Sequence, residues 1–420
     1  MRSVIFLTIF CMLSVAFADT IHVPGDYPTI QKAIDAAVNG DTVLAEPNTY
    51  YEKIDFLGKN ITVTSEGDSS DTILDAIGVG SVVTFRNGES NEAILDGFTI
   101  QNGSGTYDDK EYCGGGIYVS NASPDIVNCI IQDNIFIGSG IGAGIYISGG
   151  SPTVHDCKIN NNSNSKLGGG IAIVDGDSSS IITSPTIINC TISNNNANVG
   201  GGGIFIRAKI NYANVLIDHC TIESNHSGYY GGGATVESYA YCEISNCSIR
   251  NNSADKEGGG VYVNSKKDYY AYLHDNVINN NSLIISGYGA GISIVGHFYN
   301  IENNLICNNY SIDSGGGVSF NNTNKIYSPQ IFKNNMIFKN KAENIGGGIL
   351  FQNVNLDLIN YTVSGNNADV GGGVSFIGNS NIFMANSILW NNEATTSNKN
   401  IYIEAGANVT IIYGCEFVPT

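Results

Sequence analysis

Three charged side chains near the middle of the sequence could take part in acid–base chemistry: Asp218, Arg207 and Arg250. A pair of carboxylic acids can protonate and attack a glycosidic bond, and Ca²⁺ with Arg or Lys can promote removal of a proton beside a uronate. Both reactions need charged groups that project outward from neighbouring segments into one groove. These three residues are therefore the catalytic candidates if the protein is an enzyme.

The neighbourhood of Asp218 also has a purely structural interpretation, which we favour. Asp218 and His219 precede Cys220 in a phrase that recurs along the chain. At the same place other copies carry Val127-Asn128, His155-Asp156, Ile188-Asn189 and Ser245-Asn246. The pair Asp218-His219 is thus one variant of a repeated structural position.

The repeated phrase ends in asparagine and contains an inward-pointing aliphatic residue three positions earlier. Its asparagines are Asn134, Asn162, Asn195, Asn225, Asn252, Asn281, Asn309, Asn340, Asn366 and Asn392, and its first column holds Cys129, Cys157, Cys190, Cys220 and Cys247 in the first five copies. Glycine-rich tracts separate the phrases. From Gly116 to Gly373, the last glycines of the first and tenth tracts, the period is about 29 residues, which lies in the range of solenoids and arrays.

The spacing within each copy predicts short strands and leaves no room for a helix. Residues two apart share one face of a strand, and aliphatic side chains recur at that spacing before and after each glycine tract. A propeller blade would need about 40 residues and four antiparallel strands. The remaining solution is an all-β, right-handed parallel β-helix, in which each strand pairs with its counterpart one turn later.

In such a coil the asparagine and cysteine columns become stacks of like side chains. We expect each asparagine to lie at a bend, to adopt a left-handed backbone and to hydrogen-bond to the turns above and below. Cys129 and its equivalents would point inward as free thiols, with vertical disulfides as the alternative. The glycine tracts predict tight turns and close approach between turns.

The ends of the chain suggest its organisation and its destination. Residues 1–18 resemble a signal peptide, residues 19–60 an N-terminal cap with a helix at about 28–38 followed by the first strands, and residues 61–420 a β-helix of ten to twelve coils. No lid is visible at the C-terminal end, so that end is either self-capped or incomplete. We expect an exported protein at the outer cell surface or in the extracellular space, with no transmembrane segment in the mature chain.

Charge narrows the range of partners and cofactors. The formal net charge of −19 would repel nucleic acid. The carboxylates do not follow the Asp-x-Asp-x-Asp spacing of a calcium loop, so we predict no metal site and no cofactor, with Ca²⁺ as the alternative.

A candidate binding face follows from the strand after each glycine tract. Its middle residue should point outward, and it is aromatic in four turns of the N-terminal half: Tyr118, Tyr146, Phe205 and Tyr262. Flat rings along a rod can stack on a surface polysaccharide, or contact a protein of a host or neighbouring cell.

Two resemblances agree with this fold. The segment from Val23 to Ala37, with Pro24-Gly25-Asp26-Tyr27-Pro28 at its start, resembles the opening of β-helix proteins of the pectin-lyase-like superfamily. The alternation of Gly-Gly-Gly tracts with aliphatic-x-x-Asn phrases is similar to the repeats of the polymorphic outer-membrane protein family, which implies a surface adhesin or structural rod. We therefore predict an exported structural or adhesive module. The alternative is a polysaccharide lyase or glycoside hydrolase acting on acidic polysaccharide.

Overall fold

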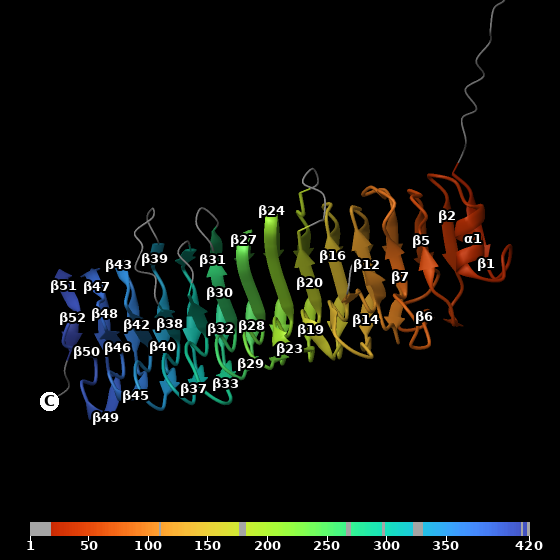
Figure 1. The fold of residues 1–420 in the computed structure, drawn as a ribbon. Coiled ribbons are helices and arrows are strands. Elements are labelled where there is room, and N and C mark those ends of the chain that lie inside the picture. Colours follow the sequence, from red (N-terminus) through yellow and green to blue (C-terminus); the bar gives the residue numbers. More distant parts are fainter. Residues whose placement is uncertain are drawn as a thin grey trace, which may run out of the picture.

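The computed structural model describes residues 18–108, 111–175, 182–265, 270–295, 299–321, 331–412 and 415–417. They form one long coil whose successive turns are stacked from the N-terminal to the C-terminal end (Figure 1). Strands of successive turns pair in parallel and build sheets of 26, 14 and 12 strands, here called sheets A, B and C. The predicted right-handed parallel β-helix is confirmed. The predicted signal peptide lies outside the described residues except for Ala18.

Two neighbouring turns illustrate the register. The first consists of β16 (Ile145–Ser148), β17 (Thr153–His155), β18 (Lys158–Asn160) and β19 (Ser165–Leu167), and the second of β20 (Ile171–Val174), β21 (Thr186–Ile188), β22 (Thr191–Ser193) and β23 (Asn196–Gly200). The first two strands of each turn lie in sheet A, the third in sheet B and the fourth in sheet C. Ile159 pairs with Ile192 in sheet B, so identical side chains lie directly over one another.

Sheet B carries the repeated phrase and is the most regular of the three sheets. Its strands are β3 (Thr49–Tyr50), β6 (Ile73–Asp75), β9 (Thr99–Gln101), β14 (Ile130–Gln132), β18 (Lys158–Asn160), β22 (Thr191–Ser193), β25 (Thr221–Glu223), β28 (Ser248–Arg250), β32 (Val277–Asn279), β36 (Leu305–Cys307), β40 (Met336–Phe338), β44 (Thr362–Ser364), β48 (Ile388–Trp390) and β52 (Cys415–Phe417). In β9 through β48 the middle residue is aliphatic and buried, and its two neighbours face outward.

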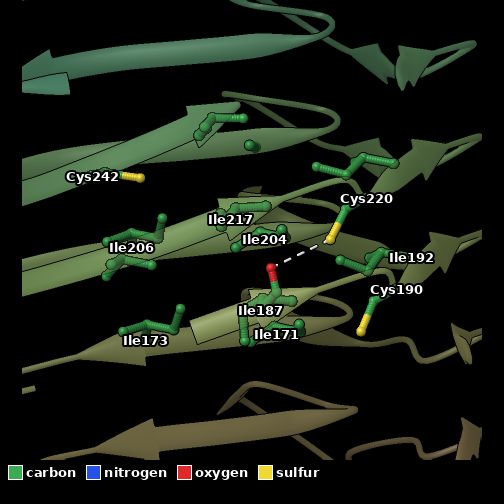
Figure 2. Close-up of a cluster of buried hydrophobic side chains, with 14 of the residues drawn as sticks. Ile171, Ile173, Ile187, Cys190, Ile192, Ile204, Ile206, Ile217, Cys220 and Cys242 are labelled. Atoms are coloured by element: carbon green, nitrogen blue, oxygen red, sulfur yellow. Dashed lines mark hydrogen bonds between the residues drawn. The ribbon is translucent and has the colours of Figure 1, made fainter. Parts of the chain in front are cut away.

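The inward side chains of successive turns pack together, and almost all of them are fully buried. Figure 2 shows two pairs of partners in sheet A: Ile171 of β20 lies beside Ile204 of β24 (Ile204–Asp218), and Ile187 of β21 lies beside Ile217 of β24. Cys220 follows β24 at the corner toward sheet B. The Cys220 thiol donates to the carbonyl oxygen of Ile187 at 3.5 Å in the preceding turn. Stacking of like residues thus produces one continuous core along the rod.

The bends on either side of sheet B use left-handed backbone, but not at the residues that we predicted. The positive φ angles fall on the residue before the first column and on the residue before the asparagine column, as at His219 (φ 52°) and Ser224 (φ 55°). The corner before the first column is built in ten turns by Asn128, Asp156, Asn189, His219, Asn246, Asp275, Asn303, Asn334, Asn360 and Asn386. Asn and Asp tolerate this conformation best, and turning the chain there leaves the next side chain pointing inward.

The asparagine column is a buried hydrogen-bonded ladder. Asn252 is fully buried. Its Nδ2 donates to the oxygen of Ile222 at 2.9 Å and to Oδ1 of Asn281 at 3.0 Å. The last glycine of each tract leaves room for the amide, because a Cβ on Gly233 would lie 3.0 Å from Nδ2 of Asn252 and 2.6 Å from the oxygen of Gly260. Glycine is needed at that position because the next turn approaches so closely.

A short helix closes the N-terminal end of the core. Helix α1 spans Ile30–Ala36, two residues shorter at each end than the predicted 28–38. It begins after Thr29, whose side chain accepts a hydrogen bond from the backbone of Lys32, and it ends because Ala37 returns to extended backbone. Its buried face, Ile30, Ala33 and Ile34, covers β1 (Thr20–Val23), β2 (Thr42–Ala45) and β4 (Ile54–Asp55) (Figure 1).

Candidate binding face

Asp218 lies at the turn where β24 (Ile204–Asp218) leads toward sheet B, and its carboxylate is used within that turn. Oδ2 is 2.7 Å from Nδ1 of His219, and Oδ1 accepts from the hydroxyl of Ser245 at 2.8 Å and from Nδ2 of Asn246 at 2.9 Å. Partial burial opposes ionisation, but the bonds from Asn246, Ser245 and His219 outweigh it and hold the pKa of Asp218 below its usual value.

Among the described residues, neither arginine forms an ion pair with Asp218. Arg250 ends a strand of sheet B and pairs with Glu223 at 2.8 Å on the neighbouring strand. Arg207 lies eleven residues before Asp218 on β24 and places its guanidinium 5.2 Å from the ring centre of Phe205. Asp218 thus has the contacts of a turn-stabilising residue, and the catalytic role of these three side chains stays a prediction.

Asp218 belongs to a polar row that follows this corner from turn to turn. Directly above it in register lie Ser245, His274, Glu302 and Lys333. His274 is held between Glu243 at 3.0 Å and Asp275 at 2.8 Å. Burial disfavours the charged imidazole, yet the two carboxylates prevail and raise the pKa of His274.

The expected aromatic face at Tyr118, Tyr146, Phe205 and Tyr262 is wrong, because all four side chains are buried. They do point out of the central core, but residues of sheet C cover Tyr118, Tyr146 and Phe205, and Tyr262 stacks on Tyr230 with ring centres 4.6 Å apart. Tyr118 and Tyr146 stack with ring centres 5.6 Å apart, and the cluster is completed by Cys113, Ile141 and Leu167. In these N-terminal turns the segment before the glycine tract therefore forms a second, smaller core against this face of sheet A.

The cysteine column is also internal. All eight cysteines whose side chains the structure describes are free and buried. Burial raises the pKa of Cys157 and of Cys242, so these thiols stay protonated and are poor nucleophiles. Within the described residues, no group of three or more His, Cys, Asp or Glu is arranged to hold a metal ion. The alternative of bound Ca²⁺ stays a prediction.

The outer face of sheet B changes character along the rod. The residue after the buried aliphatic of each strand points outward. In the N-terminal half this position is polar, with Gln101, Gln132, Asn160 and Ser193, whereas in the C-terminal half it includes Phe338 and Trp390. The residue before the buried aliphatic also points outward. In the C-terminal half this position includes Met336, which is 52% exposed, and Ile388, which is 47% exposed. Trp390, the one tryptophan of the chain, is 46% exposed.

A notch in this face results from one strand of small residues between two strands of large ones. Phe338, Ser364 and Trp390 are successive partners in register, as are Met336, Thr362 and Ile388. Two strand spacings separate Phe338 from Trp390, roughly 10 Å. The notch encloses about 360 Å³ and is lined by Met336, Phe338, Lys339, Thr362, Ser364, Gly365, Trp390 and Asn391.

The sequence contained a signal for this notch that our prediction did not use. Residues that flank the buried aliphatic of each phrase must point outward, which places Met336 and Phe338 around Ile337, and Trp390 beside Leu389. The predicted aromatic face included only the strand after each glycine tract. The phrase itself, in the C-terminal turns, carried the exposed rings.

Comparison with known proteins supports the architecture. Residues 81–187 match the family model described as a right-handed beta helix region. No curated protein matches the chain. Among solved structures, the chain is similar to the Siphovirus 9NA tailspike receptor binding domain at 12% identity and a TM-score of 0.34, over 96% of this chain and 78% of that one.

A similarity this low carries no conclusion about ligands. The resemblance to polymorphic outer-membrane repeats stays a prediction. No helix within the described ranges has both the length and the apolar character needed to cross a bilayer.

With three stacks of parallel strands and the family match, the chain is a right-handed parallel β-helix repeat protein.

Proposed function

We propose that this protein is an exported, rod-shaped β-helix module that binds carbohydrate in the notch on the outer face of sheet B. The proposal rests on the notch. Exposed Trp390 and partly exposed Phe338 lie on two strands that flank the strand of Thr362 and Ser364. Aromatic walls favour the apolar faces of sugar rings, and hydroxyl side chains between them can hydrogen-bond to sugar hydroxyls.

The size of the notch favours a sugar over a folded protein as its occupant. A volume of about 360 Å³ lies at the small end of ligand pockets. A stable protein partner would need roughly 800 Å² of contact on each side, far more than the notch alone supplies. The rigid ladder beneath it keeps the walls in register, so little order has to be gained on binding.

Export is the second part of the proposal and rests on the apolar leader of residues 1–18. Expression of the full chain in a host with a general secretion pathway should release a product that begins at Asp19. Recovery of an intact N-terminus from the cytoplasm would contradict the export part while leaving the binding part open to its own test.

A glycan array probed with the mature chain, Trp390→Ala and Val277→Ala tests binding. Val277 is a matched control, since it also lies on the outer face of sheet B and is 38% exposed, outside the notch. We expect the wild type and Val277→Ala to bind the same glycans, and Trp390→Ala to lose roughly two- to tenfold in affinity, consistent with ~0.5–1.5 kcal/mol for ring stacking. Equal binding by all three proteins, or none by the wild type, would refute the proposed site.

A further inference from the structure

We propose that the notch selects a sugar with a single anionic substituent, which Lys339 binds, and that it disfavours polyanionic chains. This inference rests on the proposed function and adds the chemical class of the ligand. It depends on where Lys339 is held, on the other charges around it, and on the overall charge of the chain.

The backbone directs Lys339 along the notch. Lys339 occupies the left-handed corner after β40 with φ 55°, a position filled in neighbouring turns by Asn308 and Gly365. Because Gly365 has no side chain, the stem of Lys339 lies over it, with Cγ 3.8 Å from the place where a Cβ would be. Glycine at this corner therefore keeps the floor of the notch open and places the lysine at its edge.

Lys339 is available to a ligand. Its side chain is exposed and takes part in no ion pair with any residue that the structure describes, whereas Lys333 and Lys341 in the same turn pair with Glu302 and Glu343. Among the eight residues that line the notch, Lys339 is the only charged one. An anionic substituent on a sugar seated between Phe338 and Trp390 would thus meet one unpaired cation and no lining carboxylate.

The rest of the molecule limits how much negative charge the ligand can carry. The formal net charge is −19, so a chain with an acid on every unit would be repelled wherever it left the notch. One acidic group in contact with Lys339 avoids most of that cost, since charges more than about 8 Å away are screened at physiological salt. Carboxylate and sulfate share this chemistry.

The test compares four ligands in solution: lactose, sialyllactose, sulfated lactose and trigalacturonate, each titrated by calorimetry at low salt. For the wild type we expect roughly two- to fivefold tighter binding of the two singly acidic sugars than of lactose, the range of an exposed ion pair. Trigalacturonate should bind no tighter than they do. Preference for one acidic lactose alone would identify the substituent.

Lys339→Asn is the decisive variant, because Asn fills this corner in other turns and suits the left-handed backbone. It should lose the preference for acidic sugars, measured as the ratio of its affinity for each acidic lactose to its affinity for lactose. Lys158→Asn is the matched control, an exposed lysine on the same face outside the notch, and it should keep the preference. Circular dichroism would establish that both variants are folded.

The outcomes separate this inference from the proposed function. If the wild type binds lactose but shows no preference for its acidic forms, or if Lys339→Asn keeps the preference, the inference is wrong and the binding function stands. Tightest binding of trigalacturonate would also overturn it. If the wild type binds none of the four ligands and no glycan on the array, both fail together.

Discussion

Asn225 donates twice to one atom of Asn252: its side-chain Nδ2 and its backbone N–H both lie 3.0 Å from Oδ1 of Asn252. The same double contact links Asn252 to Asn281, so each amide is a donor to the next turn and an acceptor from the turn before. In Asn252 both side-chain N–H groups donate to protein oxygens and Oδ1 accepts twice, which explains how this amide can occupy the interior of an apolar coil.

Truncation of one rung should therefore be costly. Asn252→Ala would remove the acceptor of both Asn225 donors and the donors to Ile222 and Asn281. We expect a loss of at least about 3 kcal/mol in the free energy of unfolding, because several buried polar groups lose their partner. Urea unfolding measures it. Ser248→Ala, on the outer face of the same turn, should change it by less than about 0.5 kcal/mol.

The first column should accept asparagine in place of cysteine at Cys247. In the next turn Asn276 already fills this column, accepts from the backbone of Cys247 at 2.9 Å and donates to Asn304. Asn at position 247 would add one rung, and its oxygen would replace the sulfur that now accepts from Cys220 at 3.4 Å. Cys247→Asn should be neutral or stabilising, whereas Cys247→Leu should lose about 1–3 kcal/mol by overpacking. A melting temperature for Cys247→Asn well below that of the leucine variant would contradict this explanation of the column.

The thiols of the core should not react in the folded protein. Cys157 is 1% exposed and its pKa is raised by burial. In a mature chain that carries Cys415→Ser, we expect no cysteine to react with a thiol reagent under native conditions. After denaturation, the remaining cysteines should react. Mass spectrometry of the labelled protein counts the adducts. Native labelling of Cys157, or a disulfide-linked pair of neighbouring column residues, would show that the core is less closed than described.

Stability should fall with rising pH through the titration of His274. Although burial opposes the charged form, Asp275 and Glu243 raise the folded pKa of His274 above the usual value of a histidine. The charged form is therefore favoured by folding, so its contribution is complete below the unfolded pKa and disappears as pH rises through the folded value. Between the unfolded and the folded pKa of His274, the free energy of unfolding of His274→Gln should decrease less with rising pH than that of the wild type. Melting temperatures measured in steps from pH 5 to 8 test it, and parallel curves for the two proteins would exclude the contribution.

The period and the inward columns could be predicted because they depend on neighbours within a few residues. Alternation around Ile159 places it on the inner face, and a period near 29 places Ile192 above it. The exposure of Tyr118 could not be predicted in the same way. Alternation correctly turned its ring away from the central core, but whether that side meets water depends on the path of a distant segment.

At the bends, the sequence likewise did not show which of two adjacent residues adopts the left-handed backbone. Asparagine in the repeated phrase correctly indicated a bend, yet the left-handed angle belongs to the preceding position, such as Asn251, while Asn252 turns inward. Both positions are rich in asparagine, so composition alone could not separate the residue that bends the backbone from the one that bonds between turns.

By itself the sequence determined a stack of like residues, because a fixed period forces equal positions into register once each strand pairs with the next turn. It also determined which side chains enter the core, since that follows from alternation along each strand. Only the tertiary structure decided which outward residues are exposed. Sheet C covers Tyr118 and Tyr146 and leaves Phe338 and Trp390 uncovered, because the chain between the phrase and the glycine tract folds over sheet A and not over sheet B.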